Sequence, residues 1–343
     1  MHMSDALLSP AVGGVMWIAS AAAIGLSVKK VSGNNDAPVL DEKKIPIMGI
    51  MGAFVFAGQM INFTIPGTGS SGHIGGGILL AALLGPAPAL ITLASVLLIQ
   101  CLFFADGGLL AFGCNVFNMG VIPCIAAYTL IYKPLVKKGL TKRNITLASI
   151  LAVVAGLLAG AFCVVLQTLA SGITELPFSV FVGLMLPIHA AIGLVEGIVT
   201  AAVLCFVHSA RPELLEGAVT SAKLDAAIPI KKVLVTFAVL TLAVGGLLSL
   251  FASAYPDGLE WSMEKTAGTA ELEREGPVYT AAADVVEKTA FMPDYGFRSG
   301  EAEAAGTATA GITGSIITVL LAGGLGFAIS AVRKKKKTGE AAV

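Results

Sequence analysis

The sequence predicts an all-α polytopic membrane protein, with about nine transmembrane helices and a small outer-side domain between the last two. Of the 343 residues, 56% are hydrophobic and only 13% are charged, whereas a soluble domain is usually about 25% charged. Apolar runs of about 20 residues, the length that crosses a bilayer, recur along the chain. The 40 glycines suit such a bundle, because small residues let membrane helices pack closely.

The apolar runs place the expected helices in order along the chain. The third is too short to cross a bilayer alone, so we expect it to stay buried in the bundle or to borrow the glycine-rich stretch before it. Proline at 86 and 88 can kink a membrane helix without ending it, so the boundary there needs a separate argument. The expected helices are about 11–28, 45–63, 74–85, 87–104, 113–132, 146–170, 178–208, 233–253 and 311–332.

The distribution of basic residues supplies that argument and predicts the orientation. Of the 22 basic residues, 18 fall in five segments, which the positive-inside rule places in the cytoplasm. Lys44 and Lys133 lie on the same side only if the chain crosses the membrane an even number of times between them. A break at Gly85 and Pro86 gives four crossings and a continuous helix gives three, so we expect the chain to reverse direction there. We therefore expect the N-terminus outside the cell membrane and the C-terminus in the cytoplasm. The five segments are 29–44, 133–143, 211–223, 231–232 and 333–337.

Charge also divides the chain into parts. Residues 254–310 hold 11 of the 22 acidic residues and four basic ones, and they lie outside in this topology. The expected parts are a seven-span domain at 1–208, a cytoplasmic linker at 209–232 and a two-span module at 233–343 that contains the outer domain 254–310.

The first apolar run is expected to be a retained membrane helix and not a cleaved signal peptide. Its lysines follow the apolar run, whereas those of a signal peptide precede it. We therefore expect Met1 and His2 to be retained on the outer side. This dipeptide holds an amine, a main-chain amide and an imidazole, and His73 lies on the same side in the glycine-rich loop 66–77. A plane of four nitrogens favours Ni(II) or Cu(II) over hard cations. The sequence thus predicts a metal site made by Met1, His2 and His73.

Several polar residues in or near the apolar runs are candidates for supporting this site. Amides near the outer ends of two spans could orient the imidazoles or could make ordinary hydrogen bonds between helices. His189 and Glu196 lie on one face of the seventh span, where ionisable residues are functional candidates, although such a pair could also lock helix packing. The amide residues are Gln59, Asn62, Asn115 and Asn118.

Other chemistries find little support in the sequence. Gly67, Gly69 and Gly72 match a dinucleotide-binding pattern, but apolar spans replace the strand and acidic residue that such a site needs. No phosphate-binding GxxxxGK[ST] motif is present, and a net charge of zero gives no electrostatic reason to bind nucleic acid. We expect a protein that is not an enzyme and carries no resident cofactor.

Five motifs together resemble the substrate-capture subunits of cobalt/nickel energy-coupling-factor transporters (the CbiM/NikM family), fused to a CbiN/NikN-like accessory module. Met3 and Ala6 depart from residues that the family tends to carry, which leaves open some retuning of the pocket. The motifs are MH with Asp5 and LSP at 8–10; QMINF at 59–63 with SGH at 71–73; FADGGLL at 104–110 with NVFNMG at 115–120; HAAIGLVEG at 189–197; and PDGLE at 256–260.

The resemblance implies a division of labour. This chain would bind Co(II) or Ni(II) from outside through the Met1 amine, the His2 amide and imidazole, and His73. Two ATPase subunits and a coupling transmembrane subunit would drive its release inward, so ATP hydrolysis would belong to those partners. The alternative is a stand-alone divalent-metal channel or secondary transporter, which would line a continuous path with more carboxylates or histidines than His189 and Glu196 provide. A membrane metalloenzyme would need an open coordination position, and a closed plane of four nitrogens argues against this alternative.

Overall fold

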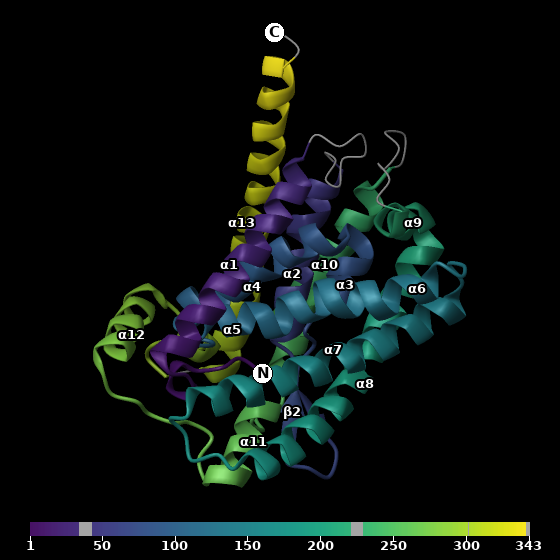
Figure 1. Ribbon diagram of the computed structural model, residues 1–343. Coiled ribbons are helices and arrows are strands. Elements are labelled where there is room, and N and C mark those ends of the chain that lie inside the picture. Colours follow the sequence, from purple (N-terminus) through teal and green to yellow (C-terminus); the bar gives the residue numbers. More distant parts are fainter. Residues whose placement is uncertain (34–42, 221–228, 301, 341–343) are drawn as a thin grey trace.

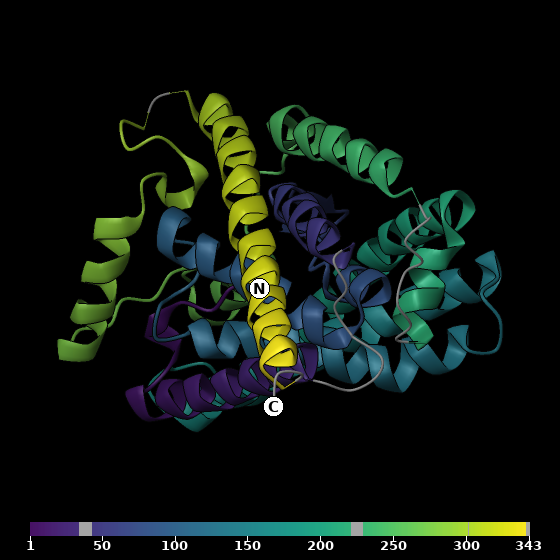
Figure 2. The same cartoon turned by 90° about the horizontal axis from the view of Figure 1, so that it is seen from above.

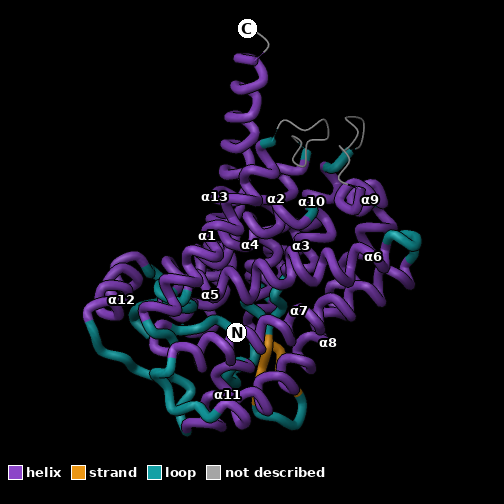
Figure 3. The backbone as a smooth tube through the Cα atoms, in the orientation of Figure 1, coloured by secondary structure: helices purple, strands orange, loops and turns teal. Residues whose placement is uncertain are grey.

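The computed structural model describes residues 1–33, 43–220, 229–300 and 302–340 and is almost entirely helical (Figures 1 and 3). The one sheet in this part of the chain is a small antiparallel hairpin of β1 (Phe63–Ile65) and β2 (Ser70–Gly72), with Thr64 opposite Ser71. The hairpin belongs to the glycine-rich loop that carries His73. The predicted fold class is therefore confirmed as mostly helical.

Seven helical spans in the described residues are long and apolar enough to cross a membrane. Two further apolar helices, α2 and α3, fall short of that length, so the expected count of nine is not confirmed. The seven spans are α1 (Pro10–Ser32), α4 (Pro86–Phe104), Phe112–Val136, α7 (Lys142–Ser171), α8 (Phe178–Ala210), Lys231–Phe251 and Ala304–Val332.

The remaining bounds complete the helical inventory. The third span joins α5 (Phe112–Asn115), η2 (Val116–Tyr132) and α6 (Lys133–Val136), the sixth joins α10 (Lys231–Gly246) and η3 (Leu248–Phe251), and the seventh lies in α13 (Glu303–Glu340). The shorter helices are η1 (Asp5–Leu7), α2 (Lys44–Gln59), α3 (Gly77–Leu84), α9 (Pro212–Thr220), α11 (Gly258–Ala267), α12 (Pro277–Thr289) and η4 (Pro293–Tyr295).

The short helix α3 is covered by protein on all sides. All eight of its residues are buried, and it packs against α4 and η2. Gly76 before it and Gly85 after it both have positive φ angles, of 76° and 87°, which glycine adopts without steric cost. Because its end and the loop before it are enclosed by protein, non-helical backbone is tolerated at this depth.

The break between α3 and α4 lies beside three lysines. Lys30, Lys44 and Lys133 line one pocket together with Gly85 and Pro86. The ends of three apolar segments, which are distant in sequence, therefore meet at one end of the bundle. This is the arrangement that the charge-based topology requires of these lysines.

The appended module packs alongside the first domain. Helix α2 lies between α10 and α13 and contacts both (Figure 2). Gly245 and Gly311 place the backbones of α10 and α13 in direct contact, as small residues permit in membrane helices. Within the helical bundle, α2 is therefore the main neighbour of the module, and α13 also contacts α4 and α1.

The segment between α10 and α13 covers the hairpin and the N-terminal segment. The Ser71 amide donates to the Pro256 carbonyl at 2.8 Å, and the Trp261 indole donates to the Thr68 carbonyl at 3.0 Å. Farther along, the Tyr279 hydroxyl donates to the Leu8 carbonyl at 2.9 Å. These contacts bring α11 next to the predicted metal ligands.

Candidate metal centre

The N-terminal segment is drawn into the bundle and fixed by its main chain. Met1 is 8% exposed and Met3 is fully buried. The Asn115 side chain accepts from the Met3 amide at 2.8 Å and donates to the Met3 carbonyl at 3.1 Å, and the Gly108 amide donates to the same carbonyl at 2.9 Å. Asn115 therefore positions the backbone next to His2; the sequence had left open whether it would orient an imidazole or make an ordinary hydrogen bond.

The structure brings His2 and His73 together across 71 positions of sequence. Their rings stack with centroids 5.5 Å apart and an interplanar angle of 26°. Nδ1 of His73 lies 3.0 Å from the Ile74 carbonyl, so this nitrogen carries the proton and donates. The Nε2 lone pair is then available to a metal, which is the usual way in which an outer carbonyl orients a ligating histidine.

A chain of amides supports His2. Its Nε2 lies 3.2 Å from Oε1 of Gln100; Gln100 donates to Gln59 at 2.8 Å, and Gln59 donates to the Gly75 carbonyl at 3.0 Å. These hydrogen bonds connect His2 to the loop that carries His73. Gln59 was a predicted supporting residue, but Gln100 was missed, although an amide inside the apolar helix α4 is the kind of signal that could have indicated it.

Two carboxylates hold metal-donor atoms of the N-terminal dipeptide. Asp106 places Oδ1 3.2 Å from Nδ1 of His2. The Met1 amine donates to Oδ2 of Asp257, while Oδ1 of Asp257 caps α11 by accepting from the amides of Leu259 and Glu260. The sequence placed Asp257 in a motif without giving it a role.

Asn118 and Asn62 each line a cavity together with predicted ligands, but their hydrogen bonds go to other residues. Asn118 makes two hydrogen bonds with Gln167, of 2.7 and 2.9 Å. The Asn62 carbonyl accepts from the Ser253 amide at 2.7 Å. Asn118 also donates to the Met3 sulfur at 3.6 Å, so it contacts the N-terminal segment without bonding to a candidate imidazole.

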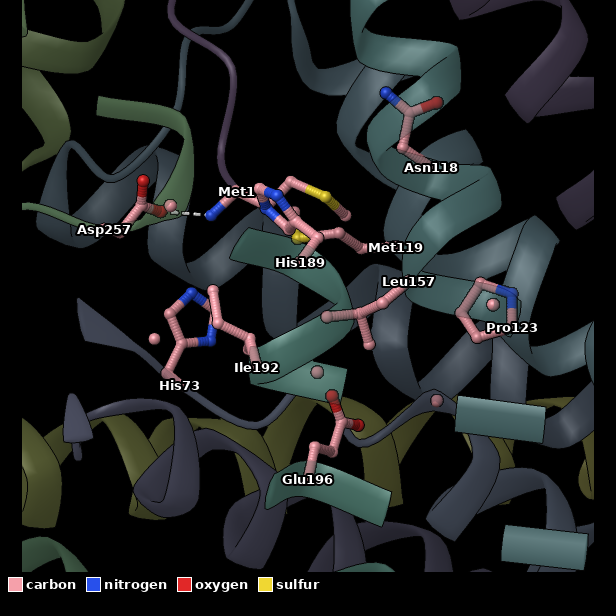
Figure 4. A pocket seen from close by; sticks show the side chains of 15 residues that line it. Met1, His73, Asn118, Met119, Pro123, Leu157, His189, Ile192, Glu196 and Asp257 are labelled. Atoms are coloured by element: carbon pink, nitrogen blue, oxygen red, sulfur yellow. Dashed lines mark hydrogen bonds and ion pairs between the residues drawn. The ribbon is translucent and has the colours of Figure 1, made fainter. Parts of the chain in front are cut away.

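His189 and Glu196 line a cavity with Met1, His73 and Asp257 (Figure 4). Nδ1 of His189 lies 2.8 Å from the Met185 carbonyl, one helical turn earlier. Oε1 of Glu196 accepts from the Gly76 amide at 2.8 Å. Glu196 thereby fixes the backbone three residues after His73.

Burial disfavours the charged form of both candidate imidazoles. It lowers the pKa of His2, although the neighbouring carboxylate of Asp106 acts in the opposite direction. Burial followed by the terminal ammonium and His2 lowers the pKa of His73 to about 4. For Asp257, burial alone would raise the pKa, but the terminal ammonium holds it well below its usual range. At neutral pH His73 therefore offers a neutral imidazole, the form that binds metals.

An acidic cavity of about 480 Å³ lies beside these donors. Its lining includes His2, His73 and both carboxylates that hold the N-terminal dipeptide, and no lysine or arginine contributes to it. Clustered carboxylates raise the local concentration of cations. The acidic lining residues are Asp5, Asp106, Asp257, Glu260, Glu271 and Asp294.

The donor set is present but not yet arranged around one point. No group of three or more His, Cys, Asp or Glu side chains in the described residues is placed to hold a metal ion. The predicted set relies on two main-chain nitrogens and two imidazoles, and it fits the residues found. Asp257 holds the amine and Asp106 faces His2, so a metal bound by these nitrogens would have to replace both contacts.

Two family assignments cover most of the chain. Residues 2–214 match the cobalt uptake substrate-specific transmembrane region, and residues 231–331 match the PDGLE domain. Similarity extends over nearly the whole chain to a putative fused nickel transport protein of Archaeoglobus fulgidus, which is 33% identical over 96% of this chain and 98% of its own.

Other relatives match the first domain. A cobalt transport protein of Geobacter sulfurreducens is 32% identical, over 63% of this chain and 61% of its own. The crystal structure of a truncated transition metal transporter superposes with a TM-score of 0.53 at 31% identity, covering 61% of this chain and 99% of that one.

Proposed function

The chain belongs to the cobalt uptake substrate-specific transmembrane family, and we propose that it is the metal-capture subunit of an ATP-driven energy-coupling-factor importer. It is a cobalt/nickel transport protein of the CbiM/NikM type and a multi-pass membrane protein. In the proposal, this chain recognises the metal, while two ATPase subunits and a coupling transmembrane subunit supply the energy. The bilayer is the remaining partner.

The proposed ligands are the Met1 amine, the main-chain amide and imidazole of His2, and the imidazole of His73. The stacking of His2 on His73 beside the Met1 amine carries this proposal. The amine and amide nitrogens are adjacent in the chain, so a cation bound by both closes a small chelate ring that His2 can extend. His73 then adds a nitrogen from a different loop, whose backbone is held by Gln59 and Glu196.

Metal capture in this proposal is an exchange of partners. In the conformation described, Asp257 holds the amine and Asp106 faces Nδ1 of His2. Each carboxylate contact favours a proton on the nitrogen that it faces, and an arriving divalent cation replaces that proton. The acidic cavity keeps the cation nearby during the exchange. Loss of protons from the amine and amide makes binding dependent on pH.

The proposed orientation places this site outside the cell membrane. The lysine-lined pocket at Gly85 supports it, because Lys30, Lys44 and Lys133 gather at one end of the bundle. The acidic cavity with Met1 and His2 is built from the loops at the other ends of α2 and α4. Basic residues favour the cytoplasmic side.

We expect nickel to be the cargo. The Archaeoglobus relative that matches this chain almost from end to end is named as a nickel transport protein. A plane of four nitrogens also suits Ni(II) better than Co(II), in line with the general order of affinities.

An N-terminal extension tests the ligand set. Four glycines added before Met1 convert the amine into an amide, move the free amine four residues away and avoid placing a histidine third in the chain, so tight Ni(II) binding should be lost in calorimetry on the purified protein. The control carries the same four glycines after Val343 and should bind as the unmodified protein does. Unchanged Ni(II) binding by the N-terminally extended protein would place the site elsewhere.

A further inference from the structure

The cavity that contains Met1 and His73 extends along α8 to a carboxylate that the proposed ligands leave unused. Its volume is about 40 Å³, and one water molecule needs about 10–15 Å³. Met1, His73 and Asp257 lie toward one end, while Glu196 lies beyond Ile192 (Figure 4). The cavity therefore connects the N-terminal site with the middle of a membrane-spanning helix.

Glu196 has one oxygen with no assigned use. The side chain is only 2% exposed. Oε1 accepts from the Gly76 amide, but Oε2 has no hydrogen-bond partner among the described residues. A buried carboxylate needs a cation, a proton or further donors to offset its lost hydration. Its position in the wall of the cavity allows a cation to supply this.

His189 lies on the same face of α8, on the other side of Ile192 from Glu196 (Figure 4). The two residues are seven positions apart, or about 10 Å along the helix axis. Because Nδ1 of His189 donates to the Met185 carbonyl, its Nε2 lone pair is available. His189 is 1% exposed. The wall formed by α8 thus carries two donor groups at successive depths.

We propose that Glu196 binds the transported divalent cation at an inner position, after the cation leaves the nitrogen ligands and passes Ile192. This inference rests on the proposed function and extends it to the inward step. One carboxylate and residual water hold a divalent cation less tightly than four nitrogens. Weak binding suits a position that the cation must also leave.

Glu196 also fixes the loop after His73, and the test has to separate the two roles. Glu196→Gln keeps a side-chain oxygen that accepts from the Gly76 amide, while it removes the negative charge. Glu196→Asp keeps the charge on a shorter side chain. The matched control is Thr200→Ala, since Thr200 is equally buried one turn farther along α8 and does not line the cavity.

Equilibrium Ni(II) binding and Ni(II) uptake are measured for each variant, the first on purified protein and the second on the complete transporter in proteoliposomes. We expect Glu196→Gln to bind Ni(II) with unchanged stoichiometry and affinity, but to lower uptake by about tenfold or more, as loss of a pathway charge would. Glu196→Asp should recover part of the uptake, and Thr200→Ala should match the unmodified protein.

Two results would overturn the inference. Unchanged uptake by Glu196→Gln would mean that the charge has no part in transport. Loss of equilibrium binding, together with uptake, would mean that Glu196 acts only by fixing the His73 loop. The proposed ligand set would fail on a different observation, namely tight Ni(II) binding by the N-terminally extended protein.

Discussion

The amine of Met1 donates a hydrogen bond to the carboxylate of Asp257, 256 positions away in the chain. The same carboxylate caps the first turn of α11. One side chain of the appended module therefore joins a helix start to a proposed metal ligand of the first domain. Metal binding at the proposed site should consequently affect the stability of α11.

Asp257→Asn tests this connection. Asparagine can still cap α11, but it loses the ion pair with the terminal ammonium, and a hydrogen bond between charged groups contributes about 1.5–3 kcal/mol. We expect thermal unfolding of the metal-free variant at a lower temperature than the unmodified protein. The difference should shrink when Ni(II) is saturating, because the amine then leaves Asp257 in both proteins.

The control for Asp257→Asn is Glu260→Gln, which removes a charge from the same cavity and keeps the oxygen that accepts from the Asp257 amide. Its effect on the unfolding temperature should be the same with and without Ni(II). An Asp257→Asn difference that Ni(II) leaves unaltered would contradict the exchange of the amine between carboxylate and metal.

His73→Ala removes one proposed nitrogen ligand. Its affinity for Ni(II) should fall by more than about 100-fold, beyond the 10–100-fold that loss of an outer-shell partner typically causes. Isothermal titration calorimetry measures it, with His208→Ala as the control, since His208 lies in the last turn of α8. Tight binding by His73→Ala would remove this residue from the ligand set.

Gln100→Ala removes the amide that faces Nε2 of His2. Affinity for Ni(II) should drop by about 10–100-fold at unchanged stoichiometry, as expected for a residue that orients a ligand. Gln167→Ala is the matched control, because Gln167 is another buried amide but pairs with Asn118. Equal losses in the two variants would indicate a general effect on packing.

Binding of Ni(II) should strengthen as the pH rises, with release of about two protons, one from the ammonium and one from the His2 amide. His73 should not contribute a proton near neutral pH, because burial lowers its pKa to about 4. Calorimetry in buffers of different ionisation enthalpy counts the protons. A count near zero would exclude the amide as a ligand.

Apolar periodicity and charge were sufficient for much of the fold. The break at Gly85 followed from the parity of crossings between Lys44 and Lys133, and the structure places these lysines around it. The shortness of α3 followed from its apolar run at about 74–85, but the neighbours that bury it are distant in sequence and could not be derived. The β1–β2 hairpin was also missed, since its residues read only as a glycine-rich loop.

For the site, the sequence indicated donor types but not their partners. His2 and His73 were identified from their chemistry, and their stacking agrees with that choice. Gln100 was missed because a single amide in an apolar helix does not reveal which residue it faces. The role of Asp257 depends on docking between two domains, and no local pattern encodes that contact.

Because both domains belong to one polypeptide, each proposed metal site is covered by a single copy of α11. Helix α13 packs on α2, and α11 docks beside the His73 loop within the same molecule. Two separate chains with these surfaces would dissociate on dilution, whereas a tethered partner is present at a high effective concentration set by the linker. Each copy of the protein thus carries its own Asp257 at a stoichiometry of one, whatever the level at which the cell produces it.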